Sequence, residues 1–144
     1  MPLELEPGER EVLAAEAVAF ARALTDPAAQ ERYARVAAAA ADGSVPDDLL
    51  PAVETMLELV FERGRPSNRA VLQAVFGKTP RGRTRQSAAH EVNQALRTLR
   101  GQSLENLRLV AGPAGHTLVI ETDRCRLTVE LDAGGARVAS LETG

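Results

Sequence analysis

Residues 86–122 read QSAAHEVNQALRTLRGQSLENLRLVAGPAGHTLVIET, and the pattern of apolar residues changes within them. Before Gly101 the apolar residues recur every three or four positions, which predicts a helix over residues 86–100. Its inward side chains are expected to be Ala88, Ala89, Val92, Leu96 and Leu99. Beyond Ser103 apolar and polar residues alternate, as in half-buried strands. A helical part therefore ends here and a sheet begins.

The C-terminal third predicts an antiparallel β-meander. Four segments alternate in polarity, and the stretches between them are rich in Gly, Pro and Asp, which favour tight turns. The expected strands are residues 107–111, 117–122, 126–131 and 137–142.

Upstream of residue 86 the helical period dominates. Residues 9–24, 26–41, 47–63 and 68–76 each combine a helical period with an N-cap or a glycine stop. Together with residues 86–100 they give about five helices followed by the meander, so the predicted fold class is α+β. We expect an acidic helical pair at 1–45, a basic centre at 46–122 and an added β-hairpin at 123–144, packed as one compact unit.

Charge is segregated along the chain although the total is only −3. Residues 1–62 carry four Arg against thirteen acidic residues, residues 63–108 carry ten Lys or Arg against two Glu, and residues 109–144 carry three Arg against five acids. This asymmetry predicts an anionic partner for the middle segment, or coverage of that segment by the acidic one.

Two groups of residues in the basic segment could bind DNA. One face of the helix at 86–100 carries side chains that can read base edges: His90, Asn93, Gln94 and Arg97. Cations before and around that helix could hold phosphates, and residues 78–85 are expected to form a loop. The predicted phosphate contacts are Arg65, Arg69, Lys78, Arg81, Arg83 and Arg85.

Three helices followed by a β-hairpin is also the element order of a winged helix. Residues 47–122 resemble the winged-helix output domain of bacterial response regulators of the OmpR/PhoB type. The matching motifs are Gly64-Arg65-Pro66-Ser67-Asn68-Arg69, Leu72, Val75-Phe76-Gly77, Val92, Leu96, Leu99-Arg100 and Gly112 to Leu118. The resemblance implies double-stranded DNA as partner, a role in transcription regulation, and a recognition helix at 86–100.

The chain departs from that family in several places. Phe76 stands where Trp is usual, and His116 stands where an aromatic residue is usual. The chain has no receiver domain, and helices replace the family's N-terminal sheet. A homodimer through the Ala-rich helices of residues 9–41 is a further expectation.

A second hypothesis needs no nucleic acid. The acidic and basic segments could pair within one chain or between chains in a non-enzymatic interaction or assembly protein, with the meander offering an edge strand. The loop at 78–85 would then bind the acidic helices, and the polar face at His90 to Arg97 would be an ordinary solvent face.

Other site classes are not expected. One cysteine, Cys125, and two histidines, His90 and His116, cannot form a usual zinc site. The carboxylates Glu54, Glu58 and Glu62 at helical spacing predict a solvated acidic face. The sequence predicts no catalytic residue, no cofactor and no metal. With no signal peptide and no apolar run of membrane-spanning length, it predicts a cytoplasmic protein.

Overall fold

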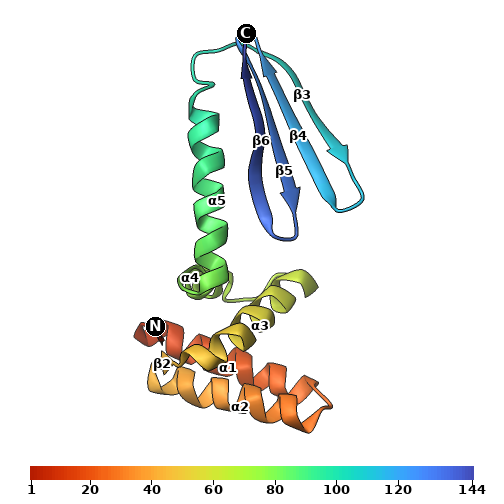
Figure 1. Ribbon diagram of the computed structural model, residues 1–144. Coiled ribbons are helices and arrows are strands. Elements are labelled where there is room, and N and C mark those ends of the chain that lie inside the picture. The colour runs from red at the N-terminus through yellow and green to blue at the C-terminus, as the bar shows by residue number, and fades with distance from the viewer. The chain divides into compact units, whose positions relative to one another are not determined.

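The computed structural model describes residues 1–144 and confirms the α+β class, with helices first and an antiparallel sheet last (Figure 1). The chain forms two compact units, Met1–Arg83 and Thr84–Gly144, here called the N-terminal unit and the C-terminal unit. The sequence predicted boundaries at 45/46 and 122/123 instead. No helix is long and apolar enough to cross a bilayer.

The N-terminal unit contains four of the helices. They are α1 (Pro7–Ala23), α2 (Pro27–Asp42), α3 (Leu50–Arg63), which follows a 3₁₀ turn at Asp47–Leu49, and α4 (Arg69–Lys78). Asp26 caps α2 as predicted, because its carboxylate accepts the N–H of Ala29 at 3.2 Å. Gly43 ends α2 with φ 91°, a conformation that favours glycine.

Two short strands that the sequence did not predict close this unit. β1 (Leu3–Glu4) pairs antiparallel with β2 (Ser44–Val45). Leu3 and Val45 are buried together with side chains from all four helices, so the chain's first residues belong to the core. Strands of two residues have no detectable period in a sequence, which is why they were missed.

The core of the N-terminal unit is aliphatic, with a single aromatic pair. Leu13, Val53, Met56 and Leu57 are fully buried. Phe20 and Tyr33 meet edge to face at 4.6 Å between ring centroids and tie α1 to α2. Ala37 and Ala40 of α2 are buried in this core, where small side chains allow close packing.

Helix α5 (Pro80–Arg97) begins six residues earlier than predicted, so the expected loop at 78–85 is wrong. The hydroxyl of Thr79 accepts the N–H of Gly82 at 3.1 Å, and Pro80 takes the first helical position, where its missing N–H costs nothing. The pair Thr79-Pro80 is therefore a helix start signal that can be recognised in the sequence.

Gly82 is required by the tight turn between α4 and α5. A Cβ at this position would lie 1.8 Å from the carbonyl oxygen of Phe76 and 2.9 Å from the Cα of Gly77. Gly77 was predicted to stop α4, but the helix continues to Lys78. The glycine that matters for the turn is therefore Gly82.

The C-terminal unit contains a four-stranded sheet in the order β3-β4-β5-β6. Its strands are β3 (Leu104–Ala111), β4 (Gly115–Thr122), β5 (Cys125–Asp132) and β6 (Gly135–Thr143). Each pairs antiparallel with the next, as predicted for a meander, and each is longer than its sequence pattern suggested.

One face of this sheet packs against α5, which lies alongside it in Figure 1. Val92, Ile120, Leu127 and Val129 form the buried centre of the contact, with Ala95 and Leu99 of α5 beside them. Ala89 and Leu96, which were expected to point inward, are exposed, and Ala95 takes the inward position. The helix is thus rotated slightly from its predicted orientation.

Replacing Gly82 by Ala should destabilise the protein by roughly 1–3 kcal/mol or more, because the new methyl group displaces backbone rather than a flexible side chain. Urea unfolding followed by circular dichroism measures the change. Gly8→Ala in the first turn of α1 is the matched control, since a Cβ there meets nothing within 4 Å and stability should hold or rise slightly. Equal stability of the two variants would contradict the close approach.

Candidate functional site

The predicted base-reading residues share one exposed face of α5. His90, Asn93, Gln94 and Arg97 are all exposed, at helical spacings that place them opposite the buried Val92. No intramolecular ion pair or side-chain hydrogen bond engages the four side chains. The face is open and polar, as either sequence hypothesis requires.

Lys78, a predicted phosphate contact, is bound within the N-terminal unit. Its ammonium group donates to Oε1 of Glu9 at 2.6 Å and to the carbonyl of Glu4 at 3.3 Å. Burial by itself would raise the pKa of Glu9, but hydrogen bonds from Lys78 and the Glu6 backbone, with the charge of Lys78, hold it below its ordinary value. A basic residue of the middle segment thus pairs with an acidic residue of α1.

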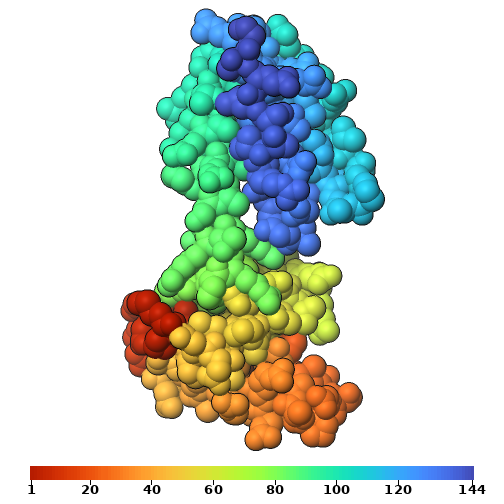
Figure 2. Space-filling view, viewed as in Figure 1, coloured from red at the N-terminus to blue at the C-terminus, as the bar shows by residue number.

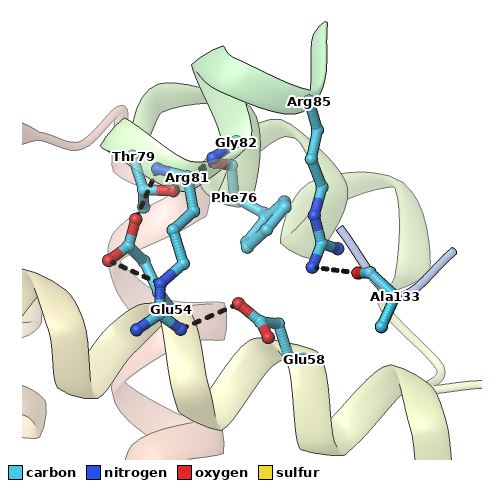
Figure 3. A network of polar contacts seen from close by, with 8 residues as sticks. All are labelled: Glu54, Glu58, Phe76, Thr79, Arg81, Gly82, Arg85 and Ala133. Carbon is cyan, nitrogen blue, oxygen red and sulfur yellow. Dashed lines mark hydrogen bonds and ion pairs between the residues drawn. The ribbon is translucent and has the colours of Figure 1, made fainter. Parts of the chain in front are cut away.

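Arg81 is bound in the same way to two acids of α3 (Figure 3). Its guanidinium donates to Oε1 of Glu58 at 3.0 Å and lies 3.6 Å from Oε1 of Glu54. The hydrogen bond to Glu58, more than the opposing burial, raises the pKa of Arg81. Two of the six predicted phosphate contacts therefore neutralise acids of their own unit.

The other four cations have different surroundings. Arg85 donates to the carbonyl of Ala133 at 2.9 Å, in the turn between β5 and β6 (Figure 3). The guanidinium of Arg69 lies 5.3 Å from the ring centroid of Phe61. Arg65 and Arg83 are exposed. The predicted phosphate set is thus divided between the two units: Arg85 belongs to the C-terminal unit and the rest to the N-terminal unit.

Glu54 corrects the prediction of a solvated acidic face on α3. It is only 4% exposed, and its Oε2 accepts the backbone N–H of Arg81 at 2.6 Å, in the first turn of α5. Glu58 is half-buried and Glu62 is exposed, so the face grades from buried to solvated. No cluster of three His, Cys, Asp or Glu side chains has a metal-binding arrangement.

Strand β3 has an unusual surface that the sequence analysis did not identify. Every one of its eight residues is exposed, including large apolar side chains. The exposed fractions are 60% for Leu104, 56% for Leu107, 59% for Leu109 and 47% for Val110. We call Leu104, Leu107 and Leu109 the leucine strip.

The leucine strip faces the same side of the sheet as α5. Leu107 is opposite Ile120 and Leu109 is opposite Leu118, and directly opposed residues share a face. Ile120 and Leu118 both pack in the cluster under α5, which includes residues of β4, β5 and β6 but none of β3. The helix therefore covers three strands and leaves the leucines of the fourth in solvent.

The alternating pattern of β3 gives no sign of this exposure. Leu107 and Leu109 alternate with Asn106 and Arg108 as in any half-buried strand. Whether such a face is covered depends on the width of the sheet relative to one helix, which is a property of the packed structure.

A search of protein-family models, curated proteins and solved structures finds no match to this chain. The resemblance to winged-helix output domains therefore stays a prediction, and the protein has two candidate surfaces, the polar face of α5 and the leucine strip.

Replacing Lys78 by Met should cost about 1 kcal/mol of stability at neutral pH, since the lysine is a third exposed and its ion pair is partly screened. The folded pKa of Glu9 is lowered, so this contribution is present above the ordinary value of 4.5 and is lost as the pH falls through the folded value. The difference between wild type and variant, measured by urea unfolding, should shrink on acidification.

Arg83→Met is the control for Lys78→Met, because it removes the same charge from an exposed side chain near the start of α5. Its effect should be small and nearly independent of pH. A Lys78→Met penalty of constant size from neutral to acid pH would show that Glu9 is not its source.

Proposed function

We propose that this chain is a non-enzymatic interaction or assembly protein whose contact surface is β3. The observation that carries the proposal is the leucine strip. Three leucines that are 56–60% exposed lie on one face of β3. This face is on the same side of the sheet as α5, but the helix does not cover it. A contiguous exposed apolar surface marks an interaction site in a folded protein.

The physical cost of leaving this strip in water supports the proposal. Full burial of one leucine side chain contributes roughly 1.5–3 kcal/mol, so a partner that covers three of them has a large driving force. Edge strands are commonly protected by Lys, Pro or inward-pointing charges. β3 contains no Lys and no Pro, and its one irregularity is a bulge between Leu104 and Asn106.

The distribution of charge favours an interaction protein over a protein that binds DNA through a positively charged surface. Residues 1–83 contain ten Lys or Arg against thirteen acidic residues, and residues 84–144 contain seven of each. Lys78 and Arg81 pair with Glu9, Glu54 and Glu58 inside the N-terminal unit. Two of the ten cations in residues 63–108 thus neutralise acids of the N-terminal unit, which is the kind of pairing that the second hypothesis predicts.

A photoreactive p-benzoylphenylalanine at position 109 should form a discrete adduct in cells that express the chain, identified by peptide mass spectrometry. The same residue at Leu141, which is 39% exposed on β6 at the other edge of the sheet, is the matched control. The adduct at 109 should disappear when Leu107→Lys is added, because a charge in the centre of the strip opposes its burial. Equal labelling at both positions, or none at 109, would refute β3 as a contact surface.

DNA binding is the second candidate, favoured by the open polar face of α5. His90, Asn93, Gln94 and Arg97 lie on one exposed helix face, the arrangement of a recognition helix. A transcriptional role of the winged-helix type would use this face, with Arg65, Arg69, Arg83 and the other cations on phosphates. The pairing of Lys78 and Arg81 with acids removes two of those contacts.

Fluorescence anisotropy with a random-sequence duplex at two salt concentrations tests this candidate. If α5 binds DNA, Arg97→Ala should weaken binding and reduce the salt slope by about 0.9 if the lost contact is to a phosphate. Arg124→Ala removes the same charge from the exposed turn between β4 and β5 and should leave both unchanged. Absence of binding at low salt, or equal effects of the two variants, would exclude α5 as a DNA-binding helix.

A further inference from the structure

We propose that the occupant of β3 is the β3 strand of a second copy of this chain, paired antiparallel about Leu107. This inference rests on the proposed function and names its partner. The two four-stranded sheets would join edge to edge into one continuous sheet, with both α5 helices on the same side.

The backbone N–H and C=O groups of Leu107 and Leu109 are oriented for pairing with a further strand. The N–H of Gly112 donates to the carbonyl of Gly115 at 2.7 Å, which makes this pair hydrogen-bonded. Hydrogen-bonded and non-hydrogen-bonded pairs alternate along an antiparallel ladder, so Leu107 and Leu109 are non-hydrogen-bonded toward β4. Their N–H and C=O groups therefore point to the open edge, where a further strand would pair.

The register about Leu107 is self-complementary for the apolar side chains. Leu107 meets the second copy's Leu107, and Asn106 meets the second copy's Arg108. Glu105 is the extra residue of the bulge and has no partner in β4. Leu104, which is opposite Thr122 of β4, is therefore opposite the second copy's Leu109 at the free edge. A rotation axis perpendicular to the sheet keeps both leucine strips on the α5 face, so opposed leucines contact each other across the new strand pair and each strip partly covers the other.

The charged residues of β3 fit the same register. Glu105 and Arg108 are exposed, and neither side chain has an ion pair or a hydrogen bond within the chain. The other strands differ: Arg126 lies 3.4 Å from Glu121, and Arg137 binds both Glu130 and Asp132. In the paired strands Glu105 stands beside the second copy's Arg108, and the two-fold axis repeats this ion pair.

The opposite edge of the sheet does not offer this complementarity. β6 also forms an outer surface of the C-terminal unit (Figure 2), but its large apolar side chain Leu141 is 39% exposed, less than any leucine of the strip. Arg137 of β6 is already paired with acids of its own sheet. β3 is thus the edge that matches a second copy.

Sedimentation equilibrium of the full chain tests the proposal by charge reversal. Wild type should be a dimer whose dissociation constant rises roughly tenfold or more in Arg108→Glu, since a rim charge facing a like charge weakens the interface. The double variant Glu105→Arg/Arg108→Glu should recover most of the loss, because it restores the ion pair in reverse. Arg124→Glu, in an exposed turn of the same unit, should leave the dimer unchanged.

Hydrogen exchange of the wild type gives an independent measurement that needs no substitution. The amides of Leu107 and Leu109 should be protected at dimer-forming concentration and exchange freely on dilution, whereas amides at the free edge of β6 should not respond. A chain that stays monomeric up to about 1 mM, or a double variant as weak as Arg108→Glu, would overturn the second copy as partner.

The result also separates this inference from the proposed function. A monomeric chain whose position 109 still cross-links to another protein, in a way that Leu107→Lys abolishes, would exclude the second copy and retain β3 as the contact surface. A monomeric chain with no adduct at 109 would refute both.

Discussion

A buried carboxylate fixes the start of the longest helix. Glu54 of α3 accepts the N–H of Arg81 at 2.6 Å, so it supplies an acceptor and a negative charge at the N-terminal end of α5. The hydroxyl of Thr79 binds the N–H of Gly82 in the same turn. A buried carboxylate is stable only when it is hydrogen-bonded and paired, and Arg81 provides both a backbone N–H and a guanidinium.

The remainder of α5 packs on the sheet of the C-terminal unit. Its apolar side chains Val92, Ala95 and Leu99 recur at helical spacing and face that sheet. The opposite face carries the polar residues from His90 to Arg97. Because one helix covers only three of the four strands, the leucines of β3 stay in water. Both candidate surfaces of the protein therefore follow from how α5 is placed on its own sheet.

The sequence predicted the elements better than it predicted their surroundings. The α+β class, the meander and the approximate bounds of the first four helices were correct, since they depend on local period and on turn residues such as Asp26 and Gly43. The segment at 78–85 was predicted as a loop because it is rich in charge and Gly and has no apolar period, although Thr79-Pro80 is a helix start signal. Glu54 was placed in solvent because a carboxylate at helical spacing gives no sign of a partner far along the chain.

The sequence by itself determined the order of helices and strands, the polar face of α5 and the leucines of β3, because side-chain chemistry and period are local properties. Only the tertiary structure decided which charges are neutralised and which leucines are uncovered. Lys78 and Arg81 find acids 69 and 27 residues away, so their pairing depends on how the helices of the N-terminal unit pack. The exposure of β3 depends on the width of a sheet that a single helix cannot cover, and no local pattern encodes that width.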